Sequence, residues 1–431
     1  MGFFLAILFF LIAYISYFAN DKRITHAFVF PFLWGIIMLA ESFHFFGLYK
    51  SNVITYVVIL VGVVSFSAGS LLFRRVVPHY AKSEIEVEYQ IQGRIFSLFL
   101  VATILLLLYP AILNIKSLIA GDVSMAMIRS SFGNVYKNVV LALLYNYIAL
   151  PFAIACLPIL AVLLISNAPG KTKIVYFFLI LVVMIEKIIM DAGRGILLYS
   201  FSMLFFAYKL FVPRDVSKAL RVKLRRILIW SLISVVIIYV LITLARGTGG
   251  SNIWHQIYIY ICGCVPFLDS NLQAVQNHQY LLGAGGFYGV LQLFFTFLDN
   301  LRLLVYPDFM VQADELYNAT LVARAVSPAD SYNAYATAFY NVYLDGGLVT
   351  VFLEMLLYGA ASRVIYNAVQ RERNNYRMRA IYVFILYGIA FSFIRFQFVL
   401  SRNIIAILFI MLVIRRKRIT DDGCTDQYSL Q

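Results

Sequence analysis

Long uninterrupted apolar segments recur along the whole chain, and they constrain its fold more than any other feature. Many reach the length of about 20 residues that an α-helix needs to cross a bilayer core of roughly 30 Å. They lack the alternation of every second residue that barrel strands show. Of the 431 residues, 62% are hydrophobic and 13% charged, whereas a soluble domain has about half and a quarter. The sequence predicts an all-α polytopic membrane protein, with residues 1–431 forming one multi-pass domain.

Eleven segments are candidate transmembrane helices. They are 2–19, 25–42, 54–73, 95–113, 139–165, 174–190, 196–212, 227–244, 338–362, 380–393 and 403–414. Basic clusters follow every odd-numbered span, at 22–23, 74–75, 171–173, 214–226, 371–379 and 415–418. Because lysine and arginine mark the cytoplasmic side, this alternation predicts an extracytoplasmic N-terminus and a cytoplasmic C-terminus.

One long extracytoplasmic loop, residues 245–337, interrupts this pattern. Its segment 253–268 is apolar but short, which favours a re-entrant or interfacial helix. Residues 287–306 place their apolar side chains on one helical stripe, which predicts an amphipathic helix on the membrane surface. If both segments instead cross the membrane, the number of spans becomes thirteen.

The loop ends in SPADSYNAYATAFYNVYLDGG, which begins at Ser327 and has an unusual polar pattern. Ser327, Pro328 and Asp330 fit the first positions of a capped helix. Such a helix would place polar side chains along one face at the outer membrane boundary: Asn333, Thr337, Asn341 and Asp345, with Tyr340 beside them. Gly346 and Gly347 predict a kink before the apolar span. This face is a candidate binding surface, although polar residues that only satisfy neighbouring helices would look similar.

Arginines on the predicted outer side are candidates for binding an anion, since that side is normally depleted of positive charge. The candidates for binding a phosphate or carboxylate are Arg194, Arg246, Arg324, Arg395 and Arg402. Solvated or structurally paired charges are the alternative for each. Candidates for proton transfer are Asp345, Asp330 and His255. A lone histidine is more often structural than catalytic, so His255 stays open between the two.

Other function classes find no support in the sequence. No residue spacing resembles a metal site, a P-loop or a nucleophile elbow. The net charge of +14 arises largely from the cytoplasmic clusters and needs no nucleic acid. Residues 1–18 lack a basic start and a small-residue cleavage motif, so they predict a retained helix and not a signal peptide. Cys262 and Cys264 fit small buried residues.

Three local patterns, in this order along the chain, resemble the O-antigen polymerases of the Wzy type, also called oligosaccharide repeat unit polymerases. They are HQIYIYICGCVPFLDSNLQ, GAGGFYGV and NAYATAFYNVYLDGGLVTVFLEMLLYG. The last is the most specific, with an aromatic-rich run before Asp345 and the two glycines. A short outer turn containing Gly-Arg-Gly, between the sixth and seventh spans, adds to the resemblance.

The resemblance implies a membrane glycosyltransferase of the bacterial inner membrane, working on the periplasmic face. Such an enzyme transfers a growing glycan from undecaprenyl diphosphate onto a new lipid-linked repeat unit, making O-antigen or capsule. Its donor carries its own leaving group, so the implied enzyme needs no cofactor and no metal. The five candidate arginines would stabilise the departing diphosphate, and a carboxylate or histidine would take the acceptor proton. The implied sugar-binding residues are Asn333, Thr337, Tyr340 and Asn341. The implied partners are lipid-linked glycans, the lipid bilayer and a chain-length regulator protein.

Alternative functions stay open at this point. An O-antigen ligase would use nearly the same residues and differ only in its acceptor. A flippase or exporter of lipid-linked oligosaccharides would show pseudo-symmetric halves and charges within mid-membrane helices. A membrane acyltransferase would need a histidine within a span, while His26 and His44 lie near span ends.

Overall fold

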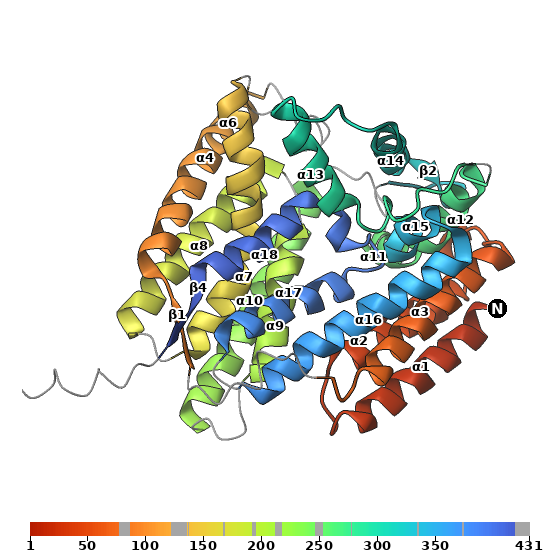
Figure 1. Cartoon of the computed structure of the whole chain (residues 1–431), viewed down its shortest axis with the longest axis horizontal. Helices are drawn as coiled ribbons and strands as arrows, with labels where there is room; N and C mark the ends of the chain where they lie inside the picture. The colour runs from red at the N-terminus through yellow and green to blue at the C-terminus, as the bar shows by residue number, and fades with distance from the viewer. Residues whose placement is uncertain are drawn as a thin grey trace, which may run out of the picture. The chain divides into compact units, whose positions relative to one another are not determined.

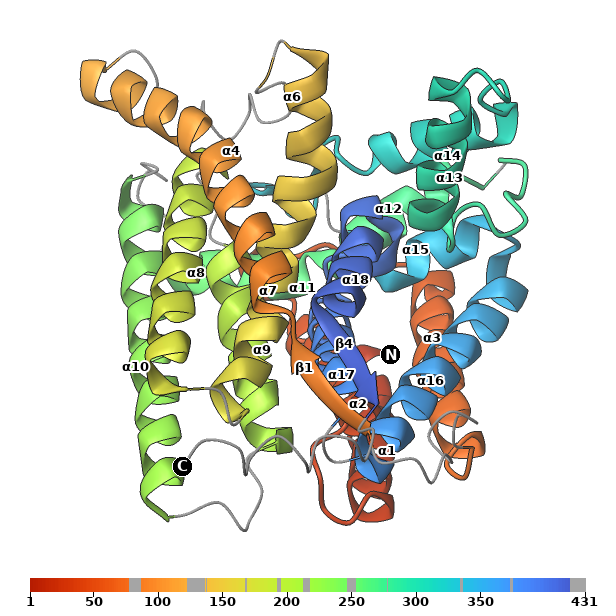
Figure 2. The same ribbon diagram turned by 60° about the vertical axis from the view of Figure 1, so that its left-hand side comes forward.

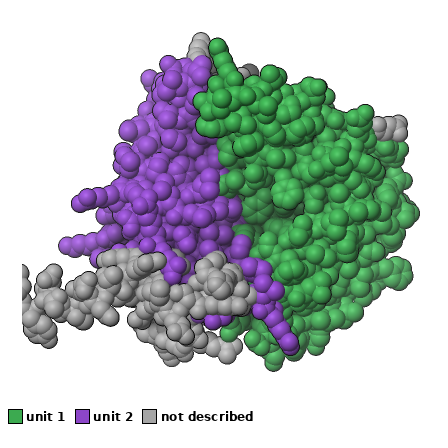
Figure 3. Space-filling model, viewed as in Figure 1, with its two compact units in different colours: residues 1–74, 236–363, 385–404 green, residues 75–235, 364–384, 405–431 purple. Residues whose placement is uncertain are grey.

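The chain is mostly helical and divides into two compact units. The computed structural model describes residues 1–76, 87–121, 136, 138–166, 169–191, 195–211, 218–245, 253–276, 278–333, 336–372 and 375–418. Unit 1 comprises residues 1–74, 236–363 and 385–404, and unit 2 comprises 75–235, 364–384 and 405–431 (Figure 3). Among the described helices, five are long and apolar enough to cross a membrane. The protein is therefore a helical protein with the composition of a membrane protein.

The N-terminal part of unit 1 is a group of three helices. These are α1 (Gly2–Ala19), α2 (His26–Glu41) and α3 (Val53–Leu72), drawn in red and orange in Figure 1. Helix α1 packs along α2. Buried aromatic rings join this group to a later segment, because Phe339 packs against Trp34 at 4.7 Å between ring centroids. Trp34 also donates a hydrogen bond to Ser392 at 3.2 Å.

The second part of unit 1 contains shorter elements. They are α11 (Ile253–Cys262), α12 (Cys264–Ala274), α13 (Tyr288–Asn300), α14 (Asp308–Ala319), β2 (Arg324–Ala325), β3 (Ser331–Tyr332), α15 (Thr337–Leu344) and the 3₁₀ turn η4 (Gln397–Val399). Helices α11 and α12 are separated at Gly263, where a Cβ atom would lie 2.5 Å from the Ile259 carbonyl oxygen. The glycine permits this approach, so the chain turns within an apolar segment.

Unit 2 is built from longer helices and one two-stranded sheet. Its elements are β1 (Val87–Ile91), α4 (Gly93–Ala120), α6 (Val139–Leu144), the π-helical turn η3 (Tyr145–Ala149), α7 (Leu150–Ile165), α8 (Gly170–Asp191), α9 (Gly195–Phe211) and β4 (Ile414–Arg418). The π turn precedes Pro151, which has no N–H to donate. Here the helix widens for one turn and then continues as α7, as π-bulges do within α-helices.

Four helices contribute residues to both units. They are α10 (Lys218–Ala245), α16 (Gly347–Arg371), α17 (Tyr376–Ala390) and α18 (Ser401–Val413). Every segment predicted to cross the membrane overlaps a described helix. The segment 338–362 is broken between α15 and α16, where Gly347 has a φ of +67°. The predicted kink at the two glycines is thereby confirmed.

Two expectations of secondary structure need correction. The described residues are helical apart from loops and two short antiparallel sheets, β1–β4 and β2–β3, which the all-α prediction lacked. The capped helix predicted from Ser327 is wrong. Residues 324–332 form a hairpin instead, in which the Val326 and Ser327 amides donate to the Asp330 carbonyl oxygen. Helix α15 begins only at Thr337, so the predicted face from Asn333 to Asp345 does not form on one helix.

Candidate active site in unit 1

The turn of the hairpin β2–β3 carries Asp330, which contacts His255 and forms the centre of the candidate active site. His255 Nε2 lies 2.9 Å from Asp330 Oδ2. The hydroxyl of Ser327 donates to the same carboxylate oxygen at 2.5 Å and accepts the Asp330 amide at 2.9 Å. Because Asp330 accepts from Nε2–H, the other ring nitrogen of His255 is left as a proton acceptor.

The His255 ring is held in place from a second side. It stacks on Phe46 at 4.4 Å between ring centroids, with 18° between the ring planes. The side chains of His255 and Asp330 remain 20% and 24% exposed. The pair is therefore fixed in orientation and still open to a bound molecule, which suits a general base and its positioning carboxylate.

Tyr258, one turn after His255 on α11, anchors the loop that presents Phe46. Its hydroxyl donates to the Ala40 carbonyl oxygen at 3.0 Å and accepts the Phe45 amide at 3.1 Å. Burial raises the pKa of Tyr258 to about 12. The hydroxyl thus keeps its proton, and its hydrogen bond, at neutral pH.

Arg324 lies at the base of the same hairpin. One terminal nitrogen donates to the Ser270 carbonyl oxygen at 3.1 Å, while Nε is buried and finds no hydrogen-bond partner among the described residues. The Tyr340 hydroxyl and the Asn271 side-chain oxygen are also buried without a partner among those residues. The positive charge of Arg324 acts on Tyr340. Buried polar atoms are normally paired. Arg324 Nε, the Tyr340 hydroxyl and Asn271 Oδ1 are therefore available for hydrogen bonds to a ligand or to water.

Asp345 holds the turn of GAGG, residues 283–286. Its two carboxylate oxygens accept the amides of Gly285 and Gly286 at 2.7 and 2.6 Å. A Cβ atom on Gly285 would lie 2.4 Å from the Asn341 carbonyl oxygen, so the approach needs glycine. Asp345 is fully buried. This geometry makes it a positioning residue that fixes the α15–α16 connection.

The carboxylates of Glu354 on α16 and of Asp345 both lie against Gly286, where a Cβ atom would be 1.8 Å from Glu354 Oε2 and 3.2 Å from Asp345 Oδ2. Glu354 was not among the candidate residues taken from the sequence. The sequence gives no signal for this proximity, because Asp345 ends α15 and Glu354 lies on the next helix, α16, beyond Gly346 and Gly347.

Arg395 belongs to a second polar cluster of unit 1. It donates to the Tyr317 hydroxyl at 2.6 Å, and Tyr317 stacks on Tyr288 at 5.2 Å. The Tyr288 hydroxyl donates to Asp314, and burial together with this hydrogen bond raises the pKa of Tyr288 well above its usual range. These contacts join α13, α14 and the segment before α18.

Other predicted site residues are placed differently. Asn333 is exposed after β3, whereas Thr337, Tyr340 and Asn341 are buried on α15. Arg402 is half-buried on α18, and its Nε has no hydrogen-bond partner among the described residues. Arg194 and Arg246 lie outside the described residues. Among the described residues, the structure therefore brings His255 and Asp330 together, with Arg324 on the same hairpin, while Arg395 and Arg402 lie before and on α18.

Metal chemistry is not indicated by the residues that the structure describes, since no group of three histidine, cysteine, aspartate or glutamate side chains could hold an ion there. Comparison of the chain with protein-family models, with curated proteins and with solved structures gives no match. The long apolar helices assign the protein to the class of helical membrane proteins.

Proposed function

We propose that the protein is a membrane glycosyltransferase that polymerises lipid-linked oligosaccharide repeat units at the extracytoplasmic face. The observation that carries this proposal is the hairpin 324–332. It supplies Asp330 to His255 at 2.9 Å and carries Arg324 at its base. A positioned base and a cation are the two groups that glycosyl transfer from a diphosphate requires.

The proposed reaction needs no cofactor. The acceptor hydroxyl oxygen forms a bond to the anomeric carbon of the donor glycan, and the bond from that carbon to the diphosphate oxygen breaks. The electron pair leaves with the diphosphate, and the acceptor proton goes to His255. Asp330 stabilises the imidazolium that results. Arg324, with Arg395 and Arg402 as further candidates, stabilises the charge that develops on the diphosphate.

The proposal includes a membrane topology. Eleven spans, an extracytoplasmic N-terminus and a cytoplasmic C-terminus put residues 253–333 on the side away from the basic clusters. That side is where a lipid-linked repeat unit would be found after its export. Undecaprenyl-diphosphate-linked glycans are the proposed donor and acceptor, and a chain-length regulator is a proposed partner.

Reconstitution provides the test. Purified protein in liposomes with lipid-linked repeat units should lengthen them without any nucleotide, as measured by gel ladders. His255→Ala should reduce elongation by about 100-fold or more, the usual contribution of a general base. Added imidazole should restore part of the rate, because it replaces the missing proton acceptor.

Two outcomes would contradict the proposal. Translocation of repeat units without elongation would establish a flippase instead. Transfer only to a different acceptor, such as a lipid A core, would establish a ligase. Full activity of His255→Ala would leave the chemistry possible but remove His255 as the base.

A further inference from the structure

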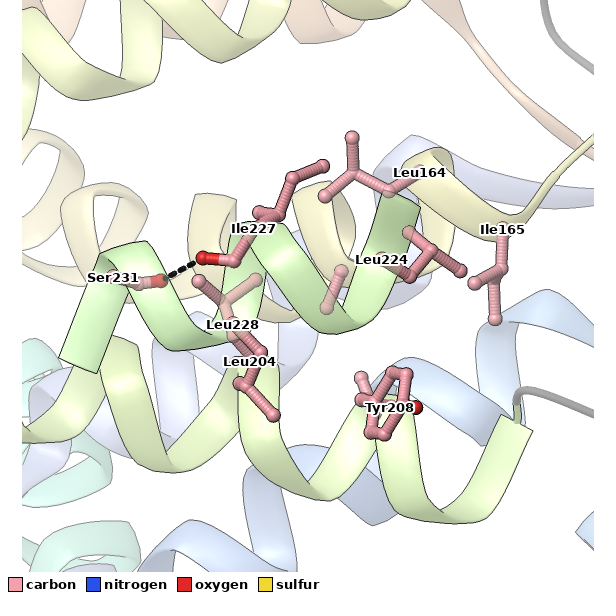
Figure 4. Close-up of a pocket in the computed structure, with 10 residues that line it drawn as sticks. Leu164, Ile165, Leu204, Tyr208, Leu224, Ile227, Leu228 and Ser231 are labelled. Carbon is pink, nitrogen blue, oxygen red and sulfur yellow. Dashed lines mark hydrogen bonds between the residues drawn. The ribbon is translucent and has the colours of Figure 1, made fainter. Parts of the chain in front are cut away.

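Unit 2 contains an apolar pocket that plays no part in the proposed reaction. Its walls come from α7, α9 and α10, and one side of the pocket is open to its surroundings. Figure 2 shows the course of these three helices. The lining residues include Leu164 of α7, Leu204 and Tyr208 of α9, and Leu224, Leu228 and Ser231 of α10 (Figure 4). The Ser231 hydroxyl donates to the Ile227 carbonyl oxygen of its own helix at 3.0 Å. The pocket therefore offers mainly hydrocarbon surface.

Helix α10 presents this surface in a regular pattern. Leu224, Ile227, Leu228 and Ser231 recur at the spacing of one helical face. Lys223 flanks that face and is exposed. Arg226, also exposed, lies about 200° around the helix from Leu224, at about 100° per residue. The same turn thus has two cations beside the pocket, Lys223 and Arg225, about 100° on either side of Leu224, and one, Arg226, directed away from it.

A further cation lies at the same end of the pocket. The ammonium of Lys173 on α8 donates to the carbonyl oxygens of Leu164 and Ser166 at 3.2 and 2.6 Å, which fixes it at the end of α7. The charge of Lys223 acts on Lys173. Like charges held near one another favour the binding of an anion between them.

An apolar pocket with a cationic rim matches the chemistry of an acidic lipid. We propose that this pocket binds an anionic phospholipid, with an acyl chain against α7, α9 and α10 and the phosphate near Lys173 and Lys223. Basic pockets between helices are a known mode of binding acidic headgroups. Lys173 and Lys223 also belong to the clusters that the positive-inside rule assigns to the cytoplasm, the side whose leaflet carries acidic lipids. This inference uses the proposed membrane topology but does not depend on the proposed glycosyl transfer.

Native mass spectrometry of the full-length protein in detergent tests the inference. Phosphatidylglycerol and phosphatidylcholine with identical acyl chains are titrated separately, and the bound lipid is counted. We expect preferential binding of phosphatidylglycerol. Lys223→Gln should weaken that binding about five-fold, the usual effect of one basic residue near an acidic lipid surface. The matched control Arg226→Gln, on the other side of the same turn, should bind as the unaltered protein does.

The acyl chain is tested separately. Ser231→Phe fills the pocket and should weaken binding of phosphatidylglycerol by a larger factor than Lys223→Gln. Because this variant could fail to fold, phosphatidylglycerol with short acyl chains is compared in the unaltered protein, where weaker binding than that of the long-chain lipid is expected.

Several results would overturn the inference. Equal binding of phosphatidylglycerol and phosphatidylcholine would mean that lipid only surrounds the apolar helices without a specific site. If Lys223→Gln and Arg226→Gln weakened phosphatidylglycerol binding equally, the lipid would not be bound at this pocket. Competition by inorganic phosphate at concentrations close to those of the lipid, with no effect of acyl-chain length, would indicate a free-phosphate site instead.

Discussion

At the scale of single residues, the candidate site depends on atoms that lie far apart in the sequence. His255 and Asp330 are 75 positions apart and meet through one hydrogen bond. Arg324 contributes a buried Nε that has no hydrogen-bond partner among the described residues. Each residue has a distinct task in the proposed reaction, and each can therefore be tested alone.

Arg324→Gln should reduce chain elongation by about 100- to 1,000-fold, the usual cost of removing one preorganised donor at a developing oxyanion. The measurement is the length distribution of the glycan made by the reconstituted protein. Arg302→Gln, an exposed arginine after α13, is the control and should leave the ladder unchanged. Normal ladders from both variants would remove Arg324 from the site.

Gly285→Ala should destabilise the protein. The added Cβ would lie 2.4 Å from the backbone carbonyl oxygen of Asn341, and overpacking of this kind costs about 1–3 kcal/mol. Thermal unfolding in detergent measures the effect. Gly170→Ala has no atom within 4 Å of the added Cβ and should unfold at the temperature of the unaltered protein. Equal stability of the two variants would show that the GAGG turn can relax.

The polar residues of the site could be recognised from the sequence, but their partners could not. Asp330 and His255 stood out because they are charged or titratable near apolar segments. The contact between them depends on a hairpin, and the sequence around Ser327 favoured a helix start there. That prediction failed because the Asp330 carbonyl and side chain are engaged by Val326, Ser327 and His255.

At the scale of elements, helix α3 begins at a carboxylate from another helix. Asp269 of α12 accepts the Asn52 amide at 3.0 Å and the Thr55 hydroxyl at 2.6 Å. It also accepts from the side chains of Asn52 and Gln273. A negative charge at a helix N-terminus is stabilising, so α12 secures the start of a candidate span.

Asp269→Ala should lower the free energy of unfolding by about 3 kcal/mol, because several partly buried donors lose their acceptor. Thermal or denaturant unfolding in detergent checks this value. Asp299→Asn changes an exposed carboxylate at the end of α13 and should have almost no effect. A loss below about 0.5 kcal/mol for Asp269→Ala, the level of an ordinary surface change, would show that water replaces the cap.

The long helices were predictable because length and hydropathy are local properties. The 18-residue helix α1 and the 20-residue helix α3 differ from their predicted spans by at most one residue at each end. Strand β4 was not predicted, because its five residues have the composition of the basic end of a span. They pair with β1, which lies more than 300 positions earlier in the chain. Partners at that separation leave no periodic signal in either segment.

At the scale of the whole molecule, the proposed topology has a direct test in intact cells. The background carries Cys424→Ser, since the three described cysteines are buried. Asn333→Cys should react with a membrane-impermeant maleimide from outside. Lys223→Cys, also at an exposed position, should react only after the cells are permeabilised. Labelling of Lys223→Cys in intact cells would contradict the topology on which both proposals place their sites.

The pairing of β1 with β4 has a consequence for biosynthesis. The sheet of residues 87–91 can form only after residues 414–418 have been synthesised. Unit 1 likewise cannot be completed before residues 385–404 have been synthesised. Both units are assembled from separate stretches of chain, so neither can close until the ribosome has passed residue 384. We expect the nascent chain to insert helix by helix as open hairpins, with cooperative tertiary structure arising late. A ribosome stalled before α18 should therefore hold a chain that proteases cleave readily, whatever the number of helices already in the bilayer.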